Sequence, residues 1–288
     1  MRGLVLKGIG GFYFVETVEG TFRAKARGVF KKDRNLIMVG DEVEVQLAAS
    51  EEDDSWITEI YQRRNSFQRP LISNIDKLVV VFSISQPEPN FLVIDKMLVT
   101  AESKGIQPIV CINKADLADE CRIEEVRAIY DRIYPTYVTT AITGVSVAEI
   151  ESLIDGSRVA LAGPSGVGKS TLVNDLVPGT NMETGDISNK TARGKHTTRH
   201  VEMIKSGAGY LFDTPGFTSL DLDSNIEASE LGRCYPEIRN AMNKCKFNNC
   251  MHINEPDCAV KKAVASGIIS ESRYRTYLGI VDEVKRKR

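Results

Sequence analysis

Gly-Pro-Ser-Gly-Val-Gly-Lys-Ser, at residues 163–170, is the stretch that decides the fold class of this chain. It matches the pattern G-x-x-x-x-G-K-[ST], whose glycines let backbone N–H groups turn toward phosphate oxygens. A short apolar run at residues 158–162 precedes it, and residues 170–177 follow with helical spacing. A strand, a glycine-rich loop and a helix in this order predict a phosphate-binding loop. The alternative is a glycine-rich turn that binds no ligand.

An Asn-Lys-Ala-Asp motif at residues 113–116 comes earlier in the chain, directly after another apolar run. The Asp116 carboxylate can accept hydrogen bonds from N1–H and the amino group of guanine, donors that adenine does not offer in that arrangement. The Lys114 stem can cover the face of the base. In isolation these residues are also a common turn composition. Thr140 and Ala141, after the next predicted strand, resemble the second base-contacting loop of GTPases.

A third motif, Asp-Thr-Pro-Gly at residues 213–216, follows the phosphate loop and a predicted strand at residues 209–212. We expect Asp213 to hold Mg²⁺ through water and the Gly216 N–H to contact the γ-phosphate; a simple turn is the alternative. An ordinary GTPase carries the phosphate loop first, then D-x-x-G, then N-K-x-D. Here the base-reading motif comes first, so the order of the motifs predicts a circularly permuted GTPase domain.

The residue after this third motif is Phe217, where Ras-like GTPases have a glutamine that orients the attacking water. Intrinsic hydrolysis is therefore expected to be slow unless a partner or another side chain replaces that function. Residues 194–199, Gly-Lys-His-Thr-Thr-Arg, occupy the position of the first switch loop. Thr198 is preferred over Thr197 as a Mg²⁺ ligand. His196 is a candidate for orienting water or stabilising charge, with a structural or surface role as the alternative.

The motifs together define the residues expected around the nucleotide. Contacts to GTP are expected from Asn113, Lys114, Asp116, Thr140, Ala141, Ser165, Gly166, Val167, Gly168, Lys169, Ser170, Thr171 and Gly216. The Mg²⁺ ligands are expected to be Ser170, Thr198 and Asp213, and the catalytic residues Lys169, Thr198 and His196.

A cluster of cysteines and one histidine lies near the C-terminus. Its spacing, Cys245-x4-Cys250-x-His252-x5-Cys258, places four soft or borderline ligands within fourteen residues. A Cys₃His set predicts one closed structural Zn²⁺ site, whereas a catalytic zinc would keep a position open for substrate. The alternative is a group of unpaired cysteines in a reducing compartment.

Three domains are predicted. Residues 1–70 contain short β-rich runs at 11–17, 21–26, 42–47 and 55–61, which predict a small barrel; basic loops would suit an OB-fold-like barrel, and an SH3-like barrel is the alternative. Residues 71–222 alternate predicted strands at 77–84, 106–112, 136–140, 158–162 and 209–212 with helices at 90–104, 120–134 and 147–154, as in an α/β sheet with helices on both faces. Residues 223–288 have helical patterns around the zinc cluster. Basic residues at 23–34 and 285–288 are expected to contact RNA phosphates, unless they form a solvated surface.

Composition sets the expected surroundings. Among the 288 residues we find no apolar run of eighteen, and the first residues lack the apolar core of a signal peptide. The clustered cysteines favour metal binding over disulfides. We therefore expect a cytoplasmic protein that does not associate with membranes and acts as a monomer.

This combination of motifs resembles one family over nearly the whole chain, the RsgA (YjeQ) family of bacterial GTPases that depend on the small ribosomal subunit. The resemblance rests on the permuted motif order, on the Gly-Lys-His-Thr-Thr-Arg segment and on the Cys₃His set. It implies an OB-fold, a permuted GTPase domain and a zinc domain. It also implies binding to the small subunit and its rRNA, stimulation of GTP hydrolysis by that subunit, and a role in late subunit maturation.

Two other functions are compatible with parts of the sequence. A GTP-dependent RNA-binding scaffold that does not hydrolyse GTP would explain Phe217 at the glutamine position. A permuted GTPase acting on membranes or transport is disfavoured, because no apolar or amphipathic anchor is evident.

Asp116 generates a prediction on nucleotide choice. The wild-type protein should bind GTP and GDP far better than ATP. Asp116→Asn should weaken the preference for guanine, because an amide offers one acceptor in place of two. Competition binding with the three nucleotides tests this, and equal affinity of the wild-type protein for ATP would refute it.

Overall fold

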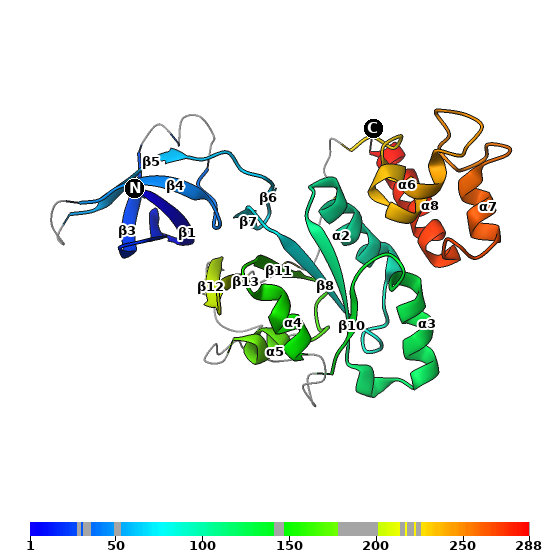
Figure 1. Ribbon diagram of the computed structural model, residues 1–288, viewed down its shortest axis with the longest axis horizontal. Helices are drawn as coiled ribbons and strands as arrows, with labels where there is room; N and C mark the ends of the chain where they lie inside the picture. The colour runs from blue at the N-terminus through cyan, green and yellow to red at the C-terminus, as the bar shows by residue number, and fades with distance from the viewer. Residues whose placement is uncertain are drawn as a thin grey trace, which may run out of the picture.

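The structure, a computed structural model, describes residues 1–27, 30, 36–48, 53–140, 147–177, 201–213, 217, 222 and 226–287. Three parts follow one another along the chain: a β-barrel, a central α/β domain and a helical C-terminal domain (Figure 1). The barrel and the C-terminal domain lie on opposite sides of the central domain. The predicted fold class, with its permuted α/β domain, is confirmed.

The N-terminal barrel has five strands in the closed order β1-β2-β3-β5-β4-β1. Their bounds are β1 Arg2–Ile9, β2 Phe12–Thr17, β3 Gly20–Ala26, β4 Glu42–Gln46 and β5 Ser55–Ile60. Alternate residues, including Val5, Val15 and Ala24, fill the interior. The sequence runs identified only four of these strands. The β1 strand was not predicted, because its apolar and polar residues do not alternate. Val5 faces the barrel interior, whereas Leu4 and Leu6, on the opposite face of the strand, pack against the central domain.

The central domain has a sheet in the order β10-β9-β8-β11-β13-β12, with β12 the only antiparallel strand among these six described strands. The bounds are β8 Lys77–Ser83, β9 Gln107–Asn113, β10 Thr136–Val138, β11 Arg158–Ala162, β12 Glu202–Ser206 and β13 Gly209–Asp213. The phosphate-loop strand β11 therefore lies between β8 and β13, in the middle of the sheet. The sequence patterns predicted the five parallel strands but not β12, of which only Met203 is buried.

Helices cover both faces of this sheet, as predicted. One face carries α2 Phe91–Ser103 and α3 Glu120–Tyr130, and the other α4 Val147–Ile154 and α5 Lys169–Leu176. The side chain of Asn90 caps α2 by accepting a hydrogen bond from the Val93 N–H, which explains where this helix starts. The predicted helix at residues 120–134 ends earlier, at Tyr130.

The barrel continues the central sheet rather than hanging from a linker. Strand β1 pairs with β12 at Lys7 and Glu202, which gives one sheet of eleven strands. A hairpin, β6 Ser66–Gln68 and β7 Leu71–Ser73, connects the two parts, and the domain boundary expected at residue 70 falls in its turn. The sequence did not reveal this strand pairing, because it depends on two edge strands that meet only in the fold.

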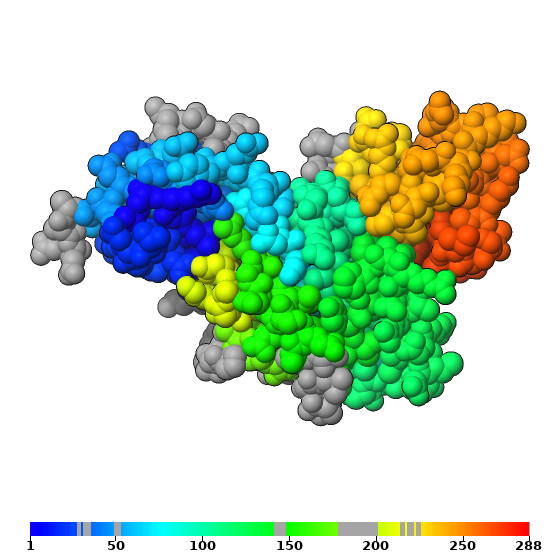
Figure 2. Space-filling model, in the orientation of Figure 1, coloured from blue at the N-terminus to red at the C-terminus, as the bar shows by residue number. Residues whose placement is uncertain are grey.

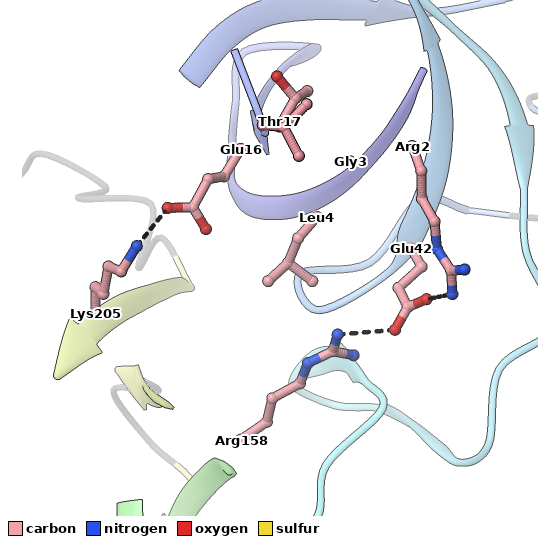
Figure 3. Close-up of a pocket in the computed structure, with 9 residues that line it drawn as sticks. Arg2, Gly3, Leu4, Glu16, Thr17, Glu42, Arg158 and Lys205 are labelled. Carbon is pink, nitrogen blue, oxygen red and sulfur yellow. Dashed lines mark hydrogen bonds and ion pairs between the residues drawn. The ribbon is translucent and has the colours of Figure 1, made fainter. Parts of the chain in front are cut away.

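Charged side chains line a cleft of about 450 Å³ at this junction (Figure 3). Glu42 of the barrel binds both Arg2 and Arg158, the first residue of β11. On the other side, Glu16 of the barrel accepts from Lys205 of β12, at 3.1 Å. These ion pairs lie at the amino ends of β11 and β13, away from the phosphate loop.

The C-terminal domain packs on α2 (Figure 2). Its elements are the short turn η2 Leu231–Cys234 and the helices α6 Pro236–Met242, α7 Ala259–Ala265 and α8 Glu271–Arg286. Val99 of α2 belongs to the core of this domain, while Ile94 and Leu98 belong to the core of the sheet. The α2 helix is therefore buried on two sides and shared by both domains.

Arg273 of α8 is completely buried at this interface. Its Nη1 lies 2.6 Å from Oδ1 of Asp95 on α2, and its Nε donates to Glu237 on α6 at 2.8 Å. The guanidinium also lies over the ring of Tyr235, 4.4 Å from its centroid, and Tyr130 and Tyr134 flank it at 5.6 Å. A buried cation between two carboxylates and three aromatic rings joins the helices of two domains.

Arg273→Met should lower the free energy of unfolding by about 3–5 kcal/mol, because it leaves buried carboxylates without their cation. Urea denaturation followed by circular dichroism measures this loss. Arg275→Met is the matched control, since Arg275 lies on the same helix but is exposed, and its ion pair is with the equally exposed Glu271. Equal effects of the two variants would contradict a structural role for the Arg273 network.

Candidate GTP site and metal centre

The predicted nucleotide motifs lie together at one edge of the central sheet. Strands β9, β11 and β13 are parallel, so their carboxyl ends meet at that edge. Asn113 ends β9, the phosphate loop follows β11, and Asp213 ends β13. Ligands of open α/β sheets bind at such an edge. The three motifs therefore lie together in space although their order along the chain is permuted.

Asn113 connects the base-reading motif to the phosphate loop. Its side chain is fully buried; the Nδ2 donates to the Val167 carbonyl at 2.8 Å, and the Oδ1 accepts from the Thr139 hydroxyl at 3.0 Å. Gly168 makes this contact possible, because a Cβ at that residue would lie 2.4 Å from the Asn113 Nδ2. Its φ of 93° also favours glycine.

The phosphate loop is held in a shape that suits an anion. Gly163 has a φ of 157°, and a Cβ there would lie 2.0 Å from the Val81 carbonyl oxygen. The Lys169 ammonium folds back to donate to the carbonyls of Gly163 and Pro164 at 2.6 and 2.7 Å. Burial lowers the pKa of Lys169 to about 8. The loop therefore places a poorly solvated cation where phosphate oxygens would replace backbone carbonyls as its partners.

The base-reading residues follow Asn113 in the short turn η1 Ala115–Leu117. Lys114 has a φ of 59°, and its Nζ donates to the Gln86 carbonyl at 2.7 Å, so its stem spans the space between two loops. Asp116 is exposed and Thr140 is buried at 8% exposure. This arrangement leaves the Asp116 carboxylate accessible to a base.

Asp213 has the properties of a metal ligand. The Oδ1 of this half-buried carboxylate is buried and has no hydrogen-bond partner in the described part of the chain. Burial, together with the neighbouring Glu202, raises the pKa of Asp213, while Lys7 of the barrel opposes this rise. A buried carboxylate oxygen without a donor fits a Mg²⁺ ion, directly or through water. Ser170, at the start of α5, is the second described residue expected at this ion.

Phe217 points away from the nucleotide site. Its side chain is fully buried and meets the ring of Phe67, in the hairpin between barrel and central domain, with 5.4 Å between centroids and 86° between planes. Its carbonyl accepts a hydrogen bond from the Gly163 N–H at 3.0 Å. Phe217 therefore anchors the chain after the Asp-Thr-Pro-Gly motif to the phosphate loop and to the hairpin.

Several predicted site residues lie outside the described part of the chain. These residues are Ala141, His196, Thr197, Thr198 and Gly216. Four other predicted contacts are described: Ser165, Gly166 and Val167 lie in the loop between β11 and α5, and Thr171 lies in the first turn of α5.

The four predicted zinc ligands converge in the C-terminal domain. Their ligand atoms all lie within 4.8 Å of one another. The Sγ atoms of Cys245 and Cys258 are 3.9 Å apart, and the His252 Nδ1 lies 3.5 and 3.4 Å from them. A tetrahedral zinc with Zn–S bonds of about 2.3 Å would hold its sulfur ligands roughly 3.8 Å apart. The set of Cys245, Cys250, His252 and Cys258 therefore fits Zn²⁺.

Residues around this cluster hold its backbone in place. Tyr274 and Tyr277 of α8 donate their hydroxyls to the carbonyls of His252 and Met251, at 2.6 and 2.7 Å. Both oxygens of the Glu255 carboxylate accept backbone N–H groups of the loop at 2.8 Å. Burial lowers the pKa of His252, which favours the neutral imidazole that binds metals.

Sequence reasoning missed some residues of the site. Thr139 orients the Asn113 amide, and Gln86 supplies the carbonyl for Lys114. Thr139 directly precedes the predicted second base loop, which was a usable signal. Gln86 and Phe67 carry no motif, so only their contacts identify them.

The geometry defines a guanine-nucleotide-binding P-loop domain of the circularly permuted class. A family model described as the RsgA GTPase matches residues 58–223, and one described as the RsgA N-terminal domain matches residues 2–57. The chain belongs to the RsgA GTPase family and is a GTP-hydrolysing enzyme, which confirms the resemblance and excludes a scaffold without hydrolysis.

Similar proteins span the whole chain. The small ribosomal subunit biogenesis GTPase RsgA of Caldanaerobacter subterraneus subsp. tengcongensis is 43% identical, over 100% of this chain and 97% of that protein. The protein of the same name from Bacillus anthracis is 41% identical, over 100% and 98%. The structure of YjeQ from Thermotoga maritima has a TM-score of 0.86 at 34% identity, covering 100% of this chain and 99% of that one. YloQ, described as a circularly permuted GTPase, has a TM-score of 0.83 at 34% identity, covering 100% and 96%.

No helix in the described part of the chain combines the length and the apolar composition needed to cross a bilayer.

The metal centre generates a prediction. The purified protein should contain about one zinc per chain, and Cys258→Ser should unfold the C-terminal domain while leaving GTP binding largely intact. Metal analysis, limited proteolysis and GTP titration measure these three properties. Cys121→Ser is the matched control, because Cys121 is exposed and outside the cluster. A metal-free protein with a protease-resistant C-terminal domain would refute the zinc site.

Proposed function

We propose that this GTPase acts in biogenesis of the small ribosomal subunit, in late maturation, and that the subunit stimulates its hydrolysis of GTP to GDP and phosphate. The observation that carries the proposal is the match, from end to end of the chain, to proteins named for small ribosomal subunit biogenesis. Such a protein works in the cytoplasm, and we expect it to act as a monomer.

The residues of the site have separate roles in the proposed reaction. Asp116 selects guanine, and the Asn113 amide holds the base-reading strand end against the phosphate loop. The backbone N–H groups of the loop bind the phosphates, and Lys169 exchanges its carbonyl partners for β- and γ-phosphate oxygens. Residues Ser170, Thr198 and Asp213 would hold Mg²⁺, which, when bound, neutralises the charge that develops on the transferred phosphoryl group.

Activation of water needs a group other than residue 217, because the Phe217 side chain is buried in the core. His196, in the segment between the phosphate loop and Asp213, is the residue we assign to this role. In our proposal, contact with the small subunit brings the segment into its productive position. Slow turnover of the free protein then follows from the position of Phe217.

The flanking domains are the proposed RNA-binding parts. We assign residues 1–70 and 223–288 to contacts with rRNA and residues 71–222 to the nucleotide cycle. Support comes from the pairing of β1 with β12 at Lys7 and Glu202 and from the packing of α8 on α2, which connect both flanks to the domain that binds GTP. A change at the γ-phosphate can therefore reach both RNA-binding parts through packed elements.

The test is phosphate release from GTP and from ATP, each with and without purified small subunits. Only GTP with subunits should give fast turnover. His196→Ala should lower this stimulated rate by about 10²–10⁴-fold and leave the binding of nucleotide and subunit unchanged. Lys169→Ala is the contrasting variant, because it should weaken nucleotide binding itself.

Two results would overturn the proposal in different ways. Turnover of GTP that subunits do not change would remove the ribosomal role while leaving the enzyme a GTPase. His196→Ala turnover at the wild-type stimulated rate would leave the ribosomal role intact and make the histidine structural.

A further inference from the structure

A row of outward-facing side chains crosses the barrel from β2 to β4. Strand registers pair Phe12 with Lys25, Lys25 with Trp56, and Trp56 with Gln46. We call these four residues the barrel row. They lie on the outer surface, because their neighbours along the strands, including Ala24, pack in the barrel interior.

Trp56 is the exposed aromatic side chain of this row. It is 41% exposed and is the only tryptophan of the chain. Phe12, two strands away, is already covered: the Arg23 guanidinium lies 4.8 Å and the Lys25 Nζ 5.0 Å from its ring centroid. Within the described residues, no ring or cation lies over the indole of Trp56 in this way. An isolated exposed apolar residue is common in proteins, so exposure of Trp56 does not by itself indicate a binding site, and the charges around it must be considered.

Three cations lie in or beside the barrel row, all from β3 or the residue after it. Arg23 and Lys25 extend from β3, and Arg27 follows that strand and donates to the Gln46 side chain at 2.9 Å. Asp54 pairs with Arg23 and Lys25 at 2.8 and 2.6 Å. Among the described residues here, these three cations outnumber the carboxylates of Asp53 and Asp54, which leaves positive charge beside a flat aromatic surface. That combination complements a chain of bases and phosphates.

We infer that the barrel row binds an unpaired stretch of RNA, with one base stacked on Trp56 and the adjoining phosphates on Lys25 and Arg27. Inside a duplex the base faces are covered by the neighbouring base pairs, so within a strand an indole on a barrel surface stacks on an unpaired base and not on a paired one. The face of strands 2 and 3 is also where OB-folds bind oligonucleotides. This inference rests on the proposed function and specifies the kind of RNA that the barrel contacts.

The single tryptophan makes the inference directly measurable. The full chain is titrated with a single-stranded oligoadenylate of about ten nucleotides and, separately, with an RNA duplex of the same length. Stacking on Trp56 should quench its fluorescence with the single strand and leave it nearly unchanged with the duplex. Equal quenching by the duplex, or binding of the single strand without any fluorescence change, would overturn the stacking contact.

Variants separate stacking from charge and from folding. Trp56→Ala should weaken single-strand binding, measured by anisotropy of a labelled oligomer, by about 5- to 150-fold. Trp56→Phe keeps an aromatic face and should stay within a few-fold of the wild-type protein. Leu71→Ala is the matched control, because Leu71 is also an exposed apolar residue, at 37%, but lies in the β6–β7 hairpin, outside both the barrel row and the nucleotide site. Unchanged single-strand binding by Trp56→Ala refutes the inference. Normal GTP binding by Trp56→Ala shows that this variant is folded.

Cosedimentation with purified small subunits distinguishes failure of this inference from failure of the proposed function. If the wild-type protein binds subunits and Trp56→Ala binds the oligomer equally well, the stacking contact is wrong and the ribosomal role stands. If the wild-type protein binds neither the subunits nor the oligomer, RNA is not the partner, and both proposals fall.

Discussion

The hydrogen bonds of one amide, the side chain of Asn113, hold the nucleotide site together. The base-reading motif and the phosphate loop follow separate strands, β9 and β11, so chain connectivity does not fix their distance. The Nδ2 donor reaches the Val167 carbonyl and the Oδ1 acceptor receives the Thr139 hydroxyl, all inside the protein. A carboxylate in this place would still accept from Thr139, but its other oxygen would face the Val167 carbonyl, and neither of these two oxygens would have a donor. The same contact requires Gly168, so a glycine of the phosphate loop also serves the base-reading side.

Permutation also explains how the two flanking domains meet the GTPase domain. The phosphate-loop strand β11 lies in the middle of the sheet. The chain enters the GTPase domain at β8 and leaves it after Phe217. The entering chain brings the barrel to the β12 edge, where Lys7 binds Glu202 beside Asp213, the proposed Mg²⁺ ligand. The leaving chain brings Arg273 to Asp95 on α2. Each flank thus covers a surface that would otherwise leave an open strand edge or an exposed apolar helix face.

The sequence alone predicted the elements whose signal is local. The phosphate loop, the Asn-Lys-Ala-Asp turn and the Cys₃His spacing are short patterns, because each ligand or contact comes from neighbouring residues. In the fold, the first two contact each other, and the four Cys₃His ligand atoms lie together in the C-terminal domain. Strands β1 and β12 were not predicted, because Leu4 and Leu6 face another domain and β12 buries only Met203. The ion pairs of Arg273 join residues far apart in sequence, and a buried arginine has no signature in an amphipathic helix that also carries exposed arginines. Contacts between domains were therefore beyond sequence patterns, while the chemistry within each domain was not.

Phe217 shows how packing constrains chemistry in this domain. Its backbone carbonyl binds the Gly163 N–H at the start of the phosphate loop, and its ring fills the space beside Phe67 in the hairpin that leads from the barrel. A glutamine with the same backbone would carry its amide into this apolar core, where burial without partners costs free energy. Restoring the Ras-type residue would thus loosen the junction without placing an amide near the γ-phosphate. The residue that aligns water in other GTPases has become part of the connection between loop and barrel, and water activation must come from elsewhere.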